Sequence, residues 1–310
     1  MRQPLDLTVM MYHYVRDRGD AAEAGSGISG MTTDVFEGQL DELEKQYVFV
    51  TWPDVSLALQ GDQPLPRPAC LLTFDDGVID HYVNVFRILG RRELSGLFFA
   101  LDRCESDELV LAHKIHFLLA RISLAELREA ILKKSNREQR EQFTQAEKKY
   151  QPRYPTTSTD DQINLLKAVL QRDLSKDANP MLSELFVMHV GSESDIARKY
   201  YLNSEQIREM VAGGMHFGGH SQNHPWFDWI DAETRAAEIQ TSAEWLRQFE
   251  PGPWAFAYPY GSLSADSPDI LKKHGFVAAF TTRTQRTHSD PYYIGRLDGE
   301  EMAQEGQGYA

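Results

Sequence analysis

The chain has 310 residues, of which 42% are hydrophobic, so it is long enough and apolar enough to bury a substantial core. Its 46 acidic and 32 basic residues give a formal net charge of -14, which argues against nucleic acid as a partner and provides no basic surface for an anionic membrane. Two cysteines are too few for a disulfide framework, and we interpret Cys70 and Cys104 as reduced.

The N-terminal segment contains neither the long apolar core of a signal peptide nor a membrane span. From this we expect a cytoplasmic protein with no integral membrane segment.

The first hundred residues alternate between strand-like and helix-like patterns. Asp34 and Glu37 are spaced as a capping box at the start of one helix, and apolar residues at helical spacing predict another over 78–89. The strands between them are apolar throughout, which is typical of a parallel sheet buried on both faces. Strands are expected at residues 7–15, 47–52, 69–76 and 95–101.

From about residue 103 to residue 201 the pattern changes to helices alone. Ser123 and Glu126 form a capping box, and apolar residues follow at helical spacing. Alternation of helices and strands resumes after this segment and continues to the C-terminal part of the chain. The sequence therefore predicts a single domain over 1–310, interrupted by a helical insertion at 103–201.

Three short motifs follow predicted strands: "TFDDG" at 73–77, "GGHSQNHP" at 218–225 and "AYPYG" at 257–261. The carboxyl ends of parallel strands are where active sites collect in α/β folds. Two histidines four residues apart, together with a carboxylate, could hold a divalent metal and leave coordination positions open for water and substrate. Adjacent aspartates after a strand could instead cap the following helix.

The three motifs and their order along the chain resemble the first three motifs of the NodB-type polysaccharide deacetylases, carbohydrate esterase family 4. The matching residues are "TFDDG", "HSQNHP" and "YPYG". The segments "MMYHYV" and "FAYPYG" resemble the branch with an N-terminal Y-H-x-V strand. This resemblance implies a distorted (β/α)7 barrel and a metal-dependent hydrolase that removes acetyl groups from sugars.

The resemblance also implies roles for individual residues. Asp76, His220 and His224 would bind one divalent metal, Zn2+ or alternatively Co2+, Ni2+ or Fe2+. Asp75 would be the general base, and the backbone N–H of Tyr260 would stabilise the oxyanion.

Of two further candidates, His13 follows from the resemblance to this branch and Arg296 from a departure from the family pattern. His13, in the N-terminal strand, would be the general acid that protonates the leaving amine, although a histidine in an apolar strand is also common in cores. The third motif has Ala257 where most family members have an arginine that pairs with the base. Arg296, near the C-terminus, is predicted to replace it.

Two features remain outside this scheme. We interpret His113 and His116 in "HKIH" as surface or groove residues of a helix. The aromatic residues Trp226, Phe227 and Trp229 could form a sugar-stacking platform or pack in the core.

The substrate expected is an acetylated sugar, either an oligosaccharide or a nucleotide-linked or lipid-linked intermediate of surface glycan biosynthesis. A deformylase or another small-acyl amidase acting on a sugar would use the same site. Because Ala257 departs from the family pattern, a catalytically inactive sugar-binding homologue is the third possibility.

Overall fold

The computed structural model describes residues 5–17, 28, 30–103 and 106–305, without the side chains of residues 160 and 303–305. Cys70 is a buried free thiol, whereas Cys104 lies outside the described residues. Along the described part of the chain, no helix combines the length and apolar character needed to cross a membrane.

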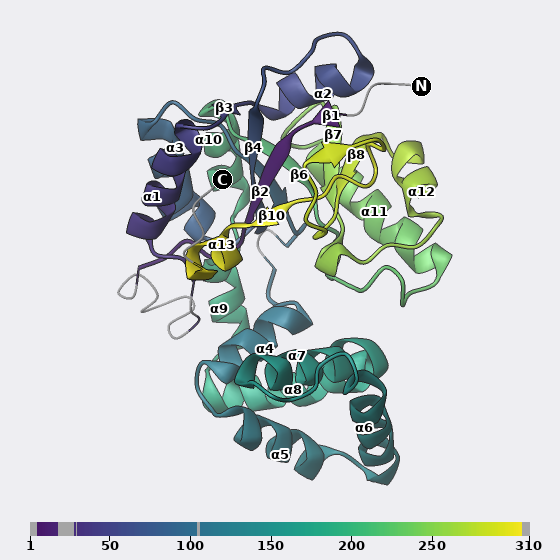
Figure 1. Ribbon diagram of the computed structural model, residues 1–310. Helices are drawn as coiled ribbons and strands as arrows, with labels where there is room; N and C mark the ends of the chain where they lie inside the picture. The colour runs from purple at the N-terminus through teal and green to yellow at the C-terminus, as the bar shows by residue number, and fades with distance from the viewer. Residues whose placement is uncertain (1–4, 18–27, 29, 104–105, 306–310) are drawn as a thin grey trace.

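A parallel sheet forms the framework of the molecule, with the strand order β10-β2-β4-β5-β6-β7-β8 and with β3 paired to β4 (Figure 1). Every pair of neighbouring strands in it is parallel. A separate antiparallel pair joins β1 to β9. The strands are β1 Leu5–Asp6, β2 Thr8–Tyr12, β3 Val48–Phe49, β4 Ala69–Asp76, β5 Leu97–Ala100, β6 His216–Gly219, β7 Trp254–Ala257, β8 Phe276–Phe280, β9 Thr287–His288 and β10 Leu297–Asp298.

The segment from 291 to 298 joins the two edges of this sheet. The backbone N–H of Thr281, directly after β8, donates to the carbonyl of Ile294 at 2.8 Å, and Leu297 in β10 pairs with Met10 in β2. One short segment therefore connects β8 to β2 and completes a distorted barrel. The predicted fold class is confirmed.

Side chains of the strands alternate between two apolar clusters, as the period of two requires. In β4, Leu72 and Phe74 belong to the cluster that contacts the surrounding helices, whereas Ala69 and Leu71 belong to the cluster inside the barrel. Asp75 continues the second series, so its carboxylate faces the barrel interior at the carboxyl end of the strand.

Helices surround the barrel, and a further set, α4 to α9, forms a separate group below it in Figure 1. We call α4 to α9 the helical group; it has an apolar cluster of its own. The division of the chain into one domain with an insertion at 103–201 stays a prediction. The helices are α1 Thr33–Glu44, α2 Trp52–Gln60, α3 Arg87–Arg91, α4 Leu111–Leu119, α5 Leu124–Lys134, α6 Arg137–Tyr150, α7 Thr159–Ala168, α8 Ser175–His189, α9 Glu193–Tyr200, α10 Ser204–Ala212, α11 Ala232–Leu246, α12 Ser267–Lys273 and α13 Gly299–Glu305, with π-helices at His81–Phe86 and Val169–Asp173.

The two predicted capping boxes have different outcomes. The one formed by Ser123 and Glu126 is present at the start of α5. The one at Asp34 was wrong, because Thr32 caps α1 by accepting a hydrogen bond from the N–H of Val35. Asp34 instead lies in the first turn, where its charge favours the helix N-terminus.

Gly77 allows the chain to turn immediately after β4. Its φ is +67°, and a Cβ there would lie 2.7 Å from the Cβ of Ala100.

We expect Gly77→Ala to lower the free energy of unfolding by about 2–4 kcal/mol, from backbone strain and overpacking together. Gly38→Ala, on the exposed surface of α1 with no atom within 4 Å of the new Cβ, should raise it by about 1 kcal/mol. Urea unfolding followed by circular dichroism checks both, and equal midpoints for Gly77→Ala and wild type would contradict this view of the turn.

Candidate active site

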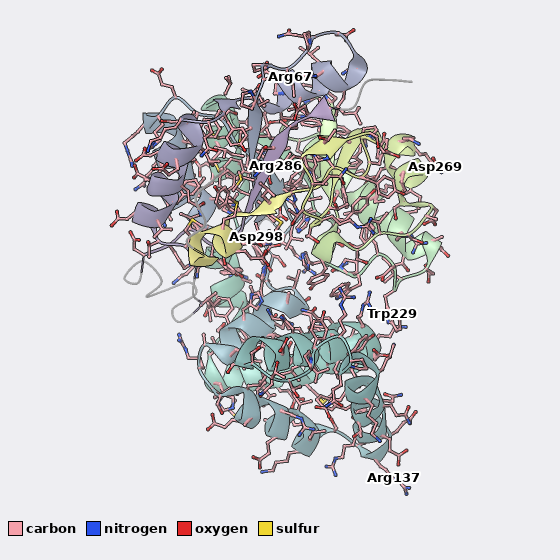
Figure 2. The ribbon with its side chains drawn as sticks, viewed as in Figure 1. Arg67, Arg137, Trp229, Asp269, Arg286 and Asp298 are labelled. Carbon is pink, nitrogen blue, oxygen red and sulfur yellow. The ribbon has the colours of Figure 1, made fainter. Side chains whose placement is uncertain are left out.

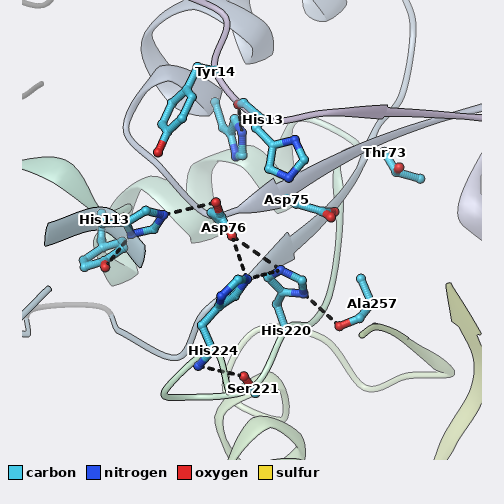
Figure 3. A network of polar contacts seen from close by, with 12 residues as sticks. His13, Tyr14, Thr73, Asp75, Asp76, His113, His220, Ser221, His224 and Ala257 are labelled. Carbon is cyan, nitrogen blue, oxygen red and sulfur yellow. Dashed lines mark hydrogen bonds and ion pairs between the residues drawn. The ribbon is translucent and has the colours of Figure 1, made fainter. Parts of the chain in front are cut away.

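The site is built around two adjacent buried carboxylates, Asp75 and Asp76, at the last two positions of β4. Asp76 has a φ of 80°, which is left-handed and unusual for a residue other than glycine. This conformation interrupts the alternation of the strand, so both carboxylates lie at the barrel's carboxyl end. They contact different partners: Asp75 pairs with Arg296, whereas Asp76 lies among histidines (Figure 3 shows the latter).

Asp76, His220 and His224 bring three potential ligand atoms within 4.8 Å of one another. The Oδ1 atom of Asp76 lies 3.4 Å from the Nε2 of His220 and 3.5 Å from the Nε2 of His224. The two Nε2 atoms are 3.2 Å apart. The structure therefore brings together all three residues predicted to bind a metal (Figure 3).

The chemistry of these atoms fits a divalent metal. The Nδ1–H of His220 donates to the carbonyl of Ala257 at 2.8 Å, which leaves the Nε2 lone pair of His220 directed at the other two groups. No donor among the described residues reaches the buried Oδ1 of Asp76. Three potential ligand atoms thus converge in a buried place, where unpaired polar atoms are costly.

The protonation states of this site also suit a metal. Burial lowers the pKa of His224 to about 3, so its ring is neutral. Burial alone would raise the pKa of Asp76, but the hydrogen bond from His113, with further contributions from His220 and His224, outweighs burial and holds that pKa well below its usual range. A neutral imidazole and an ionised carboxylate are the forms that bind metals.

The loop that carries the histidines is held by its own backbone contacts. Ser221 and His224 have left-handed φ values of 65° and 52°. The Oε2 atom of Glu238 in α11 accepts from the backbone N–H groups of Gln222 at 2.8 Å and Asn223 at 2.9 Å. Strained backbone that is fixed by such contacts is common at functional sites. The sequence alone did not identify Glu238, since only the fold places α11 against this loop.

Asp75 makes a bidentate ion pair with Arg296. Two guanidinium nitrogens of Arg296 each donate to one carboxylate oxygen of Asp75 at 2.6 Å, and its Nε donates to the carbonyl of Thr281 at 3.1 Å. Arg296 is 1% exposed and directly precedes β10. Arg296 therefore makes the pairing with Asp75 that was expected of a replacement for the arginine absent at position 257. Its role in the reaction stays a prediction.

His13, the predicted general acid, directly follows β2 and is half-buried. In Figure 3 its ring points toward Asp75 and Asp76. Burial alone would lower the pKa of His13, but the carboxylates of Asp76 and Asp75 outweigh burial and raise it. The Nε2–H of His81 donates to the His13 carbonyl at 2.9 Å and fixes the backbone at this point.

Tyr260 lies beside His224, with ring centroids 4.4 Å apart, and has a left-handed φ of 58°. Its ring also stacks on Trp226, with centroids 4.2 Å apart, and the guanidinium carbon of Arg172 lies 4.2 Å from the Trp226 ring centroid. Trp226 is therefore already in contact with two side chains. The assignment of an oxyanion-stabilising role to the Tyr260 N–H stays a prediction.

The other two aromatic residues of the proposed platform differ from each other. Phe227 is fully buried and packs in the core. Trp229 is 46% exposed and lies where the barrel meets the helical group (Figure 2). Of the three, only Trp229 has the exposure that a sugar-stacking side chain needs.

The interpretation of His113 as a surface or groove residue was wrong, whereas His116 is half-buried. His113 is 1% exposed and its Nε2 lies 3.1 Å from the Oδ2 of Asp76. The Nδ1 of His116 lies 3.0 Å from the hydroxyl of Tyr14. Their spacing of three residues places both histidines on one face of α4, but the sequence could not show what that face contacts.

A known family matches part of the chain. Residues 185–279 match the family model described as "Polysaccharide deacetylase". The search of curated proteins found no match.

Solved structures resemble nearly the whole chain. The Streptococcus pyogenes deacetylase PplD, in complex with acetate, is 16% identical and superimposes with a TM-score of 0.55 over 98% of each chain. IcaB from Ammonifex degensii is 20% identical with a TM-score of 0.57 over 97% of each chain. The de-N-acetylase from Aggregatibacter actinomycetemcomitans is 15% identical with a TM-score of 0.57 over 95% of each chain.

At these identities the solved structures show a shared fold. Together with the family model, they confirm the expected resemblance to the polysaccharide deacetylases. The branch with the Y-H-x-V strand stays a prediction.

The pair formed by Asp75 and Arg296 can be tested through stability. Arg296→Met should lower the free energy of unfolding by about 3–5 kcal/mol, because it leaves a buried carboxylate unpaired. Adding Asp75→Asn to this variant should restore part of the loss, since the unpaired charge is then removed. Urea unfolding at pH 7 measures both effects.

The control is Arg137→Met, which breaks an exposed ion pair with Glu141 and should change stability little.

The pH dependence of the stability provided by this pair follows from the pKa of Asp75. Although burial alone would raise its pKa, Arg296 lowers it, so the pair's contribution is present above about pH 4 and is lost as the pH falls through the folded-state pKa. An Arg296→Met variant as stable as the control would contradict the pairing.

Proposed function

We propose that this protein is a metal-dependent hydrolase that removes an N-acetyl group from a sugar. The observation that carries the proposal is the convergence of Asp76, His220 and His224 beside a separate, ion-paired Asp75. The polysaccharide deacetylase match over 185–279 supports the reaction class.

In this proposal a divalent metal, when bound, activates water and polarises the acyl carbonyl. Asp76, His220 and His224 hold it, with Zn2+ as the proposed ion. Asp75 accepts a proton as general base, and its pairing with Arg296 keeps it ionised and oriented.

The departing amine needs a proton, and we assign its donation to His13. The carboxylates that raise the pKa of His13 favour the protonated ring that a general acid requires. The backbone N–H of Tyr260 donates to the oxygen on which negative charge develops.

The substrate we propose is an acetylated sugar in a nucleotide-linked, lipid-linked or oligosaccharide form, within surface glycan biosynthesis. Trp229 is the candidate sugar contact, because its side chain is 46% exposed and closely follows His224 in the sequence, although the Nζ of Lys149 lies 4.1 Å from the centroid of its ring. The cytoplasmic location expected from the N-terminal sequence stays a prediction.

The alternatives depend on different observations. Ala257 motivates an inactive sugar-binding homologue, but Arg296 supplies the guanidinium that the motif lacks, and this favours the active enzyme. A deformylase would use the same groups on a smaller acyl substituent. The product released, acetate or formate, distinguishes the two reactions.

Substitution of the two aspartates separates metal binding from turnover. Asp76→Ala should lose bound metal, whereas Asp75→Asn should keep the metal and lose at least about 100-fold in turnover, as expected when a general base is removed. Metal content by atomic emission and acid release from a panel of N-acetylated and N-formylated nucleotide sugars measure the two properties.

Asp269→Asn, on an exposed part of α12, is the matched control and should keep both properties. A wild-type protein that binds no divalent metal would overturn the proposal. Full turnover by Asp75→Asn would overturn the assignment of the base.

A further inference from the structure

Asp76 has two carboxylate oxygens with different surroundings. Its Oδ1 faces His220 and His224, whereas its Oδ2 lies 3.1 Å from the Nε2 of His113, which comes from α4 in the helical group (Figure 3). A residue far from the three sequence motifs therefore contacts the carboxylate at the centre of the candidate metal site.

The proton positions in this contact follow from its partners. An ionised carboxylate only accepts hydrogen bonds, so the Nε2–H of His113 donates to Asp76. The Nδ1 atom of His113 then accepts a hydrogen bond from the Tyr201 hydroxyl, with 2.8 Å between Nδ1 and the hydroxyl oxygen. The Tyr201 oxygen in turn accepts from the backbone N–H of Val110 at 3.1 Å. One consistent arrangement runs from Val110 through Tyr201 and His113 to Asp76.

The helix that carries His113 is firmly attached to the rest of the helical group. Lys114, the next residue, is 1% exposed and donates to Asn179 and Ser183 of α8, each at 2.8 Å. It also forms an ion pair with Glu193 of α9 at 2.8 Å. These contacts fix the position of α4, so the His113 ring is presented to Asp76 by a rigid support.

A second connection reaches the backbone next to Asp76. The backbone N–H of Leu202 donates to the carbonyl of Gly77 at 2.9 Å, and the N–H of Ile79 donates to the carbonyl of Tyr200 at 2.7 Å. The residues that end the helical group therefore pair with the turn that follows Asp76. Side chain and backbone of this turn are both held from the same region.

We propose that His113 is a positioning residue: it donates a hydrogen bond to the Oδ2 atom of Asp76, so that Oδ1 is the oxygen that binds the metal. With Oδ2 occupied, Asp76 provides a single oxygen ligand in a fixed direction. The helical group is then part of the metal site. This inference rests on the proposed metal-binding function, and it goes beyond that function by assigning a role to residues outside the three motifs.

Removing the donor should weaken the site. In His113→Leu, the Oδ2 of Asp76 has no donor from His113 and can turn toward the metal, so affinity should fall by roughly 10–100-fold, the effect expected when a group that orients a metal ligand is lost. In His113→Gln, a side-chain N–H can still donate, and much of the affinity should return. Tyr201→Phe, which removes the hydroxyl that donates to the Nδ1 of His113 and accepts from Val110 but leaves the Nε2–H of His113, should have a smaller effect than His113→Leu.

The measurement is a competition titration of the metal-free full-length protein with Zn2+, together with the visible absorption spectrum of the Co2+-loaded protein. The spectrum reports ligand geometry, so a purely structural role for His113 would not change it. His189→Leu, an exposed histidine at the end of α8, is the matched control and should bind both ions like wild type. Circular dichroism and unfolding midpoints, taken without metal, show that each variant is folded.

A folded His113→Leu with wild-type Zn2+ affinity and an unchanged Co2+ spectrum would overturn the inference and leave the proposed function intact. If the Zn2+ affinity of His113→Gln fell as far as that of His113→Leu, the hydrogen-bonding role of His113 would also be overturned. Failure of the wild-type protein to bind either ion would overturn both the inference and the proposed function.

Discussion

Two neighbouring carboxylates buried at the end of β4 are the constraint on which the site depends. Burial of charge without a partner costs several kcal/mol, and two like charges side by side add repulsion. The structure gives each its own partners. Arg296 neutralises Asp75, and histidines surround Asp76. This separation lets one carboxylate serve as a base while the other binds a cation.

These partners come from distant parts of the chain. Arg296 belongs to the segment that closes the barrel between β8 and β2, so closure of the fold and ionisation of Asp75 depend on the same residues. His220 and His224 follow β6, and His113 comes from the helical group. The site therefore combines groups from the barrel and from the helical group.

The sequence predicted the parts of this arrangement that have local signals. Apolar runs revealed the strands of the sheet, and the motifs after three of them contain the three candidate metal ligands and Asp75. Ser123 capped its helix as predicted, whereas Asp34 did not, because Thr32 competes for the same helix start. The contacts of His113 and Glu238 could not be predicted, because they depend on how the helices that carry these two residues pack against the motif segments. Arg296 was anticipated only because Ala257 stands at the arginine position of the third motif, which left Asp75 without a partner arginine.

The central claim is that Asp76, His220 and His224 form one metal site with a single oxygen from Asp76. Anomalous diffraction at the zinc edge, from crystals grown with Zn2+, tests it most directly. We predict one peak about 2.0–2.2 Å from the Oδ1 of Asp76 and the Nε2 atoms of both histidines, with Oδ2 still bonded to His113. No peak among these three residues, or a peak bound to His113 instead, would contradict the account.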